Sequence, residues 1–323
     1  MTDRQKRVRI WAPLLAVLLL FAGSLAAGRY PLDWSKLGDP AGMDARVFVN
    51  LRLGRTLMVV LAGAATGMSG WVLQTVFRNP LAAPDVIGLA SGASAGAGLS
   101  ILLFSGVTAL TSLFAFGGAV LAVALVILMN RLAGRRGISS LVICGICVNA
   151  VFQAALTLLK VSADKENLIA SMEFWTMGSF ADITLSRFLT VLPWTLAGLA
   201  GMLLLDRKIR MLAFSDDEAS MLGVPVHRVR VAALLSAALA VGSVISAVGL
   251  ISFAGLLAPH IARQLSPRKQ SGLAFSGLCG VGLLLAADIL TRCVTARELP
   301  ISVWTSLLGV PLLLILLLRR ERD

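Results

Sequence analysis

Charged residues are scarce in this sequence. Only 14% of its 323 residues are charged, whereas 57% are hydrophobic. A soluble protein carries about a quarter charged residues, because polar groups have to cover its surface. The shortage of charge therefore excludes an ordinary soluble domain.

The sequence also lacks the patterns that catalysis and cofactor binding need. It contains no GxxxxGK[ST] motif, so it cannot hold ATP through a P-loop. Its two histidines, His227 and His260, form no HExxH pair, and no Ser/His/Asp constellation is visible. We expect no catalytic residue, no metal site and no cofactor in this chain.

Cysteine is rare as well. The four cysteines all lie in apolar segments: Cys144, Cys147, Cys279 and Cys293. No disulfide framework follows from this pattern. Cys144 and Cys147 have CxxC spacing but no second pair and no polar setting, so we interpret them as small residues of a packed helix.

Long apolar runs are present instead, for example over 11–27 and 57–76. At about 1.5 Å per residue, such runs cross a hydrocarbon core of about 30 Å. They predict an all-α, polytopic membrane protein with about ten transmembrane helices. The expected helices cover 8–28, 54–77, 86–105, 109–130, 138–160, 187–205, 229–249, 251–265, 271–292 and 303–318. The shortest, 251–265, contains Pro259, so we expect a broken or re-entrant segment there.

The basic residues indicate how the chain is oriented. A net charge of +12 is compatible with nucleic-acid binding, but the charges stand in short clusters between apolar runs, which is typical of membrane-protein loops. We expect no nucleic-acid partner, a location in the lipid of the cytoplasmic (inner) membrane, and both termini in the cytoplasm. The clusters include Arg131, Arg135, Arg136; Arg207, Lys208, Arg210; Arg268, Lys269; and Arg319, Arg320, Arg322.

The N-terminus combines four basic residues with the apolar run 11–27. This pattern fits a signal peptide or an uncleaved first helix. The run is longer than a signal core of about 7–15 residues, which favours the helix.

Two loops on the outer side are long, 29–50 and 161–186. The stretch 167–180 in the second loop predicts a short interfacial helix, anchored by Phe174 and Trp175. The whole chain, 1–323, reads as a single transmembrane domain. A weak internal repeat relates about 54–160 to 229–318.

Residues 77–88 (FRNPLAAPDVIG) break the apolar pattern with two prolines and an asparagine. The chain is expected to turn here. Gly88, Gly92 and Gly96 then recur every four residues and form a smooth stripe for close helix packing.

Residues 215–223 (SDDEASMLG) predict a short cytoplasmic helix. Ser215 is a candidate N-cap, Asp216, Asp217 and Glu218 suit the positive end of the helix dipole, and Gly223 suits the C-terminal turn. The helix is either a solvated connector or a lever that fits a cleft on a cytoplasmic partner.

Asp288 is the carboxylate that lies deepest in an expected span. Charge inside a membrane is costly and faces protein or water. Arg292 lies four residues later, at ion-pair spacing. A structural ion pair is favoured over a proton relay.

Taken together, several motifs resemble the permeases of the iron-siderophore, haem and cobalamin ABC importers, the FecCD-type family of type II importers. The matching segments are 51–57 (LRLGRTL), 78–88 (RNPLAAPDVIG), 175–179 (WTMGS), 216–223, 249–263 (GLISFAGLLAPHIAR), 287–288 and 298–311 (ELPISVWTSLLGVP). They run in family order over nearly the whole chain. Gly54, Ala254 and Ser302 depart from the commonest family residues and leave the cargo open.

The resemblance implies a set of partners and site residues. The partners are cytoplasmic ATPase subunits that hold ATP and Mg, a second permease subunit, an extracytoplasmic binding protein and a metal chelate. The ATPase-coupling helix would comprise Ser215, Asp216, Asp217, Glu218, Ala219, Met221, Leu222 and Gly223. Exposed Arg52, Arg55 and Arg292 would dock the binding protein, and Ser139, Ser140, Asn79 and Pro80 would belong to the inner gate or pathway.

The function that follows is import of a metal chelate by alternating access, with a separate ATPase as the motor. A ferric siderophore is the favoured cargo, and haem and cobalamin are the alternatives. A different class, an ion-coupled secondary transporter, would need titratable groups near mid-membrane. An intramembrane enzyme is disfavoured by the missing motifs.

Overall fold

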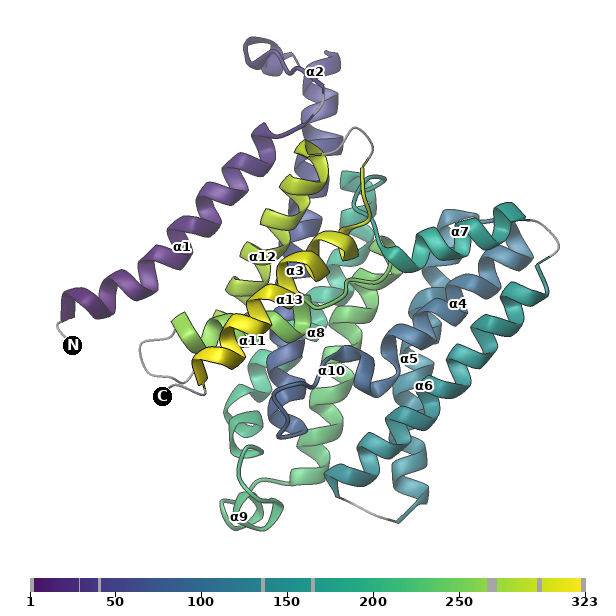
Figure 1. Cartoon of the computed structure of the whole chain (residues 1–323), viewed down its shortest axis with the longest axis vertical. Helices are drawn as coiled ribbons and strands as arrows, with labels where there is room; N and C mark the ends of the chain where they lie inside the picture. Colours follow the sequence, from purple (N-terminus) through teal and green to yellow (C-terminus); the bar gives the residue numbers. More distant parts are fainter. Residues whose placement is uncertain are drawn as a thin grey trace.

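The computed structural model describes residues 3–28, 30–39, 42–134, 137–163, 166–265, 272–294 and 298–320. Within these ranges every regular element is a helix, as the sequence predicts, and the helices form one bundle (Figure 1). The basic residues Arg135, Arg136, Arg268, Lys269 and Arg322 lie outside the described residues.

The long helices correspond closely to the expected ones. They are α1 (Asp3–Ala26), α3 (Gly54–Val76), α4 (Leu89–Phe104), α5 (Thr108–Leu132), α6 (Ile138–Val161), α8 (Leu185–Met211), α10 (Val226–Val248), α12 (Leu273–Cys293) and α13 (Ile301–Arg320). Short elements stand between them: η1 (Trp34–Gly38), α2 (Met43–Arg46), η2 (Val47–Leu53), η3 (Pro84–Ile87), α7 (Glu166–Met177), α9 (Asp216–Met221) and α11 (Ala254–Leu265).

Six helical segments are long and apolar enough to cross a membrane: Met43–Val76, Thr108–Leu132, Ile138–Val161, Leu185–Met211, Val226–Val248 and Leu273–Cys293. Shorter apolar helices occupy Trp11–Ala26, Leu89–Phe104 and Ile301–Pro311. The fold is that of a multi-pass membrane protein. The predicted short helix in the second outer loop is confirmed as α7, although its place at the membrane surface stays a prediction.

The expected first outer loop, 29–50, is wrong in part. Helical backbone already begins at Met43, passes through the π-helical η2, and continues into α3 without a break. The polar residues Asp44, Arg46 and Asn50 hide this extension, because an apolar run marks only the part of a helix that lies in hydrocarbon.

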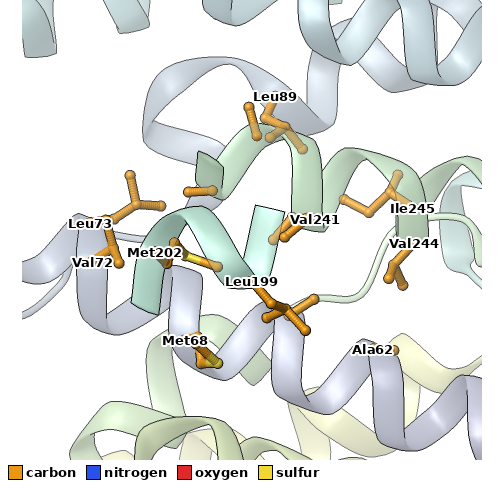
Figure 2. Close-up of a cluster of buried hydrophobic side chains, with 14 of the residues drawn as sticks. Ala62, Met68, Val72, Leu73, Leu89, Leu199, Met202, Val241, Val244 and Ile245 are labelled. Carbon is orange, nitrogen blue, oxygen red and sulfur yellow. The ribbon is translucent and has the colours of Figure 1, made fainter. Parts of the chain in front are cut away.

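The centre of the bundle is α3. Of its most apolar window, 83% is buried inside the protein, whereas the corresponding share is 28% in α5 and in α6. It packs against α8, α10, α11 and α12. In Figure 2, Met68 and Val72 of α3 lie near Met202 of α8 and Val241 of α10, in the core that these helices share.

The predicted glycine stripe is a packing surface between α4 and α5. A side chain at Gly92 would collide with the carbonyl oxygen of Gly118, and one at Gly96 would collide with that of Phe114. The two backbones therefore touch, as small residues allow in membrane helices.

A break at residues 249–253 separates α10 from α11, so the break expected in this region is present, but it lies before Pro259, which sits inside the continuous α11. Gly249 takes a positive φ of 83°, a conformation that favours glycine. Beside it, Ser179 N donates to Val248 O at 2.7 Å, and Ile301 N donates to Gly178 O at 3.0 Å. Three of the family-like motifs, 175–179, 249–263 and 298–311, therefore meet at this break.

Candidate functional site

The candidate coupling helix α9 lies at one end of the bundle, at the bottom of Figure 1. Ser215 caps it as predicted: Glu218 N donates to Ser215 Oγ at 3.2 Å, and Ser215 N donates to Glu218 Oε2 at 2.8 Å. This reciprocal capping box satisfies two donors that the helix leaves open. Ser215 Oγ also donates to Glu218 Oε2 at 2.8 Å, and this bond together with the one from Ser215 N lowers the pKa of Glu218.

The C-terminal end of α9 is also locally determined. Gly223 has a φ of 78°, Gly223 N donates to Ser220 O at 2.9 Å, and Val224 N donates to Ala219 O at 3.1 Å. These two bonds form a Schellman motif, which needs a residue in the left-handed region. The prediction that Gly223 ends the helix is confirmed.

Asp216 ties α9 to two other segments. Arg78 Nη2 donates to Asp216 Oδ1 at 2.5 Å, and Arg230 Nη2 donates to the same oxygen at 2.9 Å. Arg78 also donates to Leu212 O at 2.9 Å. Arg78 belongs to the turn after α3 and Arg230 to α10, so one carboxylate joins three parts of the chain. Burial alone would raise the pKa of Asp216, but the hydrogen bonds and charges of Arg230 and Arg78 bring it below its ordinary value.

Apolar side chains stand exposed around α9. Met221 is 87% exposed, Leu222 59% and Phe214 54%, whereas Ala219 is fully buried against the chain. Asp217 and Glu218 are exposed on the same short element. Exposed apolar groups next to charged ones are typical of a surface that a partner covers.

The expected gate residues lie in two turns. Asn79 and Pro80 are exposed in the turn after α3, where Leu81 N donates to Asn79 Oδ1 at 2.9 Å. Ser139 and Ser140 lie in the first turn of α6. In the described part of the chain, no hydrogen bond joins the two pairs, and their role in gating stays a prediction.

Two of the three expected docking arginines cap α1. Arg52 Nη1 donates to Leu25 O at 3.1 Å and to Ala26 O at 2.7 Å, while Arg292 Nη1 donates to Ser24 O at 3.0 Å. Cations are favourable at a helix C-terminus, where carbonyl groups lack partners. Both side chains hold the end of α1 against the bundle.

The third arginine, Arg55, belongs to a buried ion-pair cluster. Its Nη2 donates to Asp288 Oδ1 at 2.8 Å and its Nη1 donates to Glu298 Oε2 at 2.8 Å. Arg292 Nη2 donates to the other oxygen of Asp288 at 2.5 Å. The predicted Asp288–Arg292 pair is therefore confirmed. The sequence spacing did not reveal that Arg55 also binds Asp288, or that Glu298 binds Arg55.

The expected exposure of these arginines is wrong. Arg52 and Arg55 are each 7% exposed and Arg292 is 6% exposed, because carbonyls of α1 and the carboxylates of Asp288 and Glu298 bind them inside the protein. Docking of a binding protein through them stays a prediction, and it would require them to leave these partners.

A cavity of about 190 Å³ lies beside the α10–α11 break. Its polar lining comes from α3, η3, α4, α6 and the break itself: Thr66, Asp85, Ser91, Asn149, Gln153 and Ser252. None of the expected gate or pathway residues lines this cavity. Asn149 and Gln153 are spaced four apart in an apolar helix, and that spacing could have indicated them. In the described residues, no group of three metal-ligating side chains lies together.

These features define a helical membrane permease with a partly polar interior cavity and a short capped helix at one end. Residues 14–319 match the FecCD transport family. The chain belongs to this family, whose motifs it resembles in sequence order.

Individual relatives cover the chain almost completely. The hemin transport system permease protein HmuU of Yersinia pestis is 33% identical over an alignment of 332 positions, which covers 99% of this chain and 98% of the relative. The ferric enterobactin permease FepG of Escherichia coli (strain K12) is 36% identical over 327 residues and 98% of each chain. A solved inward-facing metal-chelate type ABC transporter is similar with a TM-score of 0.82 and 31% identity, over 97% of this chain and 99% of the other.

Proposed function

We propose that this chain is the membrane permease of an ABC importer for a metal chelate, in a cytoplasmic (inner) membrane with both termini inside. The chain moves its cargo and catalyses no reaction. A separate ATPase binds α9, a second permease subunit completes the channel, and a binding protein delivers the chelate on the opposite side.

The observation that carries this proposal is the construction of α9. Its ends are closed by a capping box and a Schellman motif, its base is held by Asp216, and its apolar tip at Met221 and Leu222 is exposed. A solvated connector needs no such tip. Exposed apolar side chains on a well-capped helix can pack into a cleft on a cytoplasmic partner.

The same contacts give α9 a route to the interior. Asp216 holds Arg78, and Arg78 begins the segment 78–88 that ends in η3. Asp85 of η3 lines the cavity. A push on α9 would therefore move the turn at Asn79 and Pro80 and the cavity wall together, which is the linkage that alternating access needs.

A ferric siderophore is the proposed cargo, with haem and cobalamin as alternatives. The identity to a ferric enterobactin permease and to a hemin permease supports a metal chelate. Polar groups such as Asn149 and Gln153 can donate and accept hydrogen bonds from a chelate without chelating the metal themselves. Uptake of a ferric siderophore and of hemin by the complete importer, measured side by side, tests the choice.

Replacement of the apolar tip tests the coupling role. We expect the double variant Met221→Ser, Leu222→Ser to bind the ATPase about tenfold or more weakly, because two side chains lose their burial at the interface. Affinity for the ATPase in detergent is the measurement.

The matched control is Leu132→Ser, which removes a 77% exposed leucine at the end of α5. It should leave ATPase affinity unchanged. Equal affinity of the tip variant and the wild type would exclude α9 as the coupling element. Substitution of Asp216, Asp217 and Glu218 together should also weaken association, but Asp216 and Glu218 hold α9 itself, so the tip variant is the cleaner test.

An ion-coupled secondary transporter is the rival class. Asp288, its expected titratable group, is 0% exposed and bound by two arginines, so it is not free to relay protons. Collapse of the proton gradient should leave uptake intact, whereas loss of the ATPase should abolish it.

A further inference from the structure

A groove of about 600 Å³ lies at the end of the bundle opposite α9. One wall is the first half of α5 and the other is the first half of α8, and Ser243, Ser246 and Ala247 of α10 form its floor. Both wall helices pack on α10. The volume falls in the range of about 300–1,000 Å³ that is usual for small-molecule sites.

The lining of this groove combines polar and apolar side chains along both wall helices. Arg187 and Ser112 lie near the outer end. Phe116 and Trp194 lie one and two helical turns deeper, about 10 Å below Arg187 in the case of Trp194. Their rings are in contact, with centroids 6.2 Å apart.

The guanidinium group of Arg187 makes few hydrogen bonds within the described residues. Among the described residues, its one hydrogen bond is a long one, from Nη2 to Ser112 Oγ at 3.4 Å. Asp182 is the charged neighbour that acts on it, without a hydrogen bond. A guanidinium in a partly enclosed groove favours a bidentate oxyanion, and phosphate matches that geometry.

The apolar part of the groove is open rather than covered by protein. Leu113 is 62% exposed and Trp194 is 57% exposed. In a membrane-spanning bundle, exposed apolar surface between the two headgroup regions faces acyl chains.

We propose that this groove binds one phospholipid of the leaflet opposite α9. Its phosphate lies on Arg187 and Ser112, and an acyl chain runs along Leu113, Phe116 and Trp194. The bound lipid fills the space between α5 and α8, which both rest on α10.

Native mass spectrometry of the delipidated full chain tests this site with three probes: a phosphatidylglycerol, a diacylglycerol with the same acyl chains, and inorganic phosphate. We expect phosphatidylglycerol to bind. The diacylglycerol lacks the phosphate and inorganic phosphate lacks the acyl chains, so both should bind far more weakly. Arg187→Gln should lower phosphatidylglycerol affinity about tenfold, and Arg187→Lys should restore part of it.

Two further variants separate the groove from general lipid binding. Ala109→Trp places a bulky ring in the groove and should displace the lipid with Arg187 intact. Arg207→Gln removes an exposed arginine at the other end of α8 and should have no effect on this lipid.

Several results would overturn the proposal. Equal phosphatidylglycerol binding by the wild type and Arg187→Gln would do so, as would binding of inorganic phosphate alone. If the wild type binds no lipid and forms a dimer that Ala109→Trp cannot form, the groove is the binding site of a second copy of the chain instead.

Discussion

Single charges organise the end of the bundle opposite α9. Asp288 pairs with Arg55 and Arg292, and Arg55 also pairs with Glu298, so two carboxyl and two guanidinium groups form one cluster in which Glu298 is the most exposed member. Arg52 adds a further cation, directed at the carbonyls that end α1. This arrangement explains how α1, which Figure 1 shows leaning away from the bundle, is held at its C-terminal end.

Replacement of Asp288 tests this cluster. Asp288→Ala leaves two buried arginines without their shared partner, so we expect a loss of about 3–5 kcal/mol in the free energy of unfolding. Thermal unfolding in detergent, followed by intrinsic fluorescence, is the measurement.

The control is the ion pair between Lys160 and Glu173, whose side chains are 27% and 48% exposed. Glu173→Ala should cost less than about 1 kcal/mol, because water screens an exposed pair. Similar losses in the two variants would show that the cluster is not the anchor that its burial indicates.

The sequence predicted part of this residue-scale picture. Arg292 follows Asp288 at helical spacing, so the pair could be foreseen. Arg55 lies 233 residues from Asp288 along the chain, and no local pattern connects them. The arginines were wrongly expected to be exposed for the same reason. Their positions near the ends of predicted spans do not show which distant residues pack over them.

At the scale of elements, α9 was predictable because its determinants are local. Ser215 and Gly223 mark its ends by capping chemistry alone. The partners of Asp216 were not predictable, because Arg78 lies 138 residues away in another turn.

Asp216→Asn tests the link between α9 and the turn after α3 that contains Asn79 and Pro80. The variant keeps the apolar tip, so the ATPase should still bind, but ATP-driven uptake should fall several-fold because the charge that holds Arg78 and Arg230 is lost. Asp206→Asn breaks an i,i+4 pair with Arg210 in the same region and should preserve uptake. Unchanged uptake by Asp216→Asn would remove this link from the mechanism.

The pH dependence of the link follows from the lowered pKa of Asp216. A carboxylate of this kind contributes fully above its ordinary pKa of about 4 and loses its contribution as the pH falls through the lowered value. Association of α9 with the bundle should therefore be constant from about pH 8 to about pH 5.

Two neighbouring glycines test the contact of α4 with α5. Gly118→Ala places a methyl group against the carbonyl of Gly92 and should destabilise the protein by about 1–3 kcal/mol. Gly117 has open space beside it, so Gly117→Ala should be neutral or stabilising by up to about 1 kcal/mol through helix propensity. Equal thermal stability of the two variants would contradict the close contact.

At the scale of the whole molecule, the helical architecture was predictable because apolar runs of membrane length have one stable solution in lipid. The helical extension before α3, at 43–53, was missed because polar residues interrupt its apolar pattern. The cavity at Asp85, Asn149 and Gln153 was missed because it depends on segments brought together by folding. The weak internal repeat stays a prediction.

The central claim is that this chain is a permease without its own motor, driven through α9 by a separate ATPase. Uptake into proteoliposomes that contain the permease and its binding protein, with or without the ATPase, tests it most directly. The account predicts ATP-dependent accumulation of the chelate only when the ATPase is present, and its loss in the Met221→Ser, Leu222→Ser variant. Accumulation of chelate against its gradient in vesicles that lack any ATPase would contradict it.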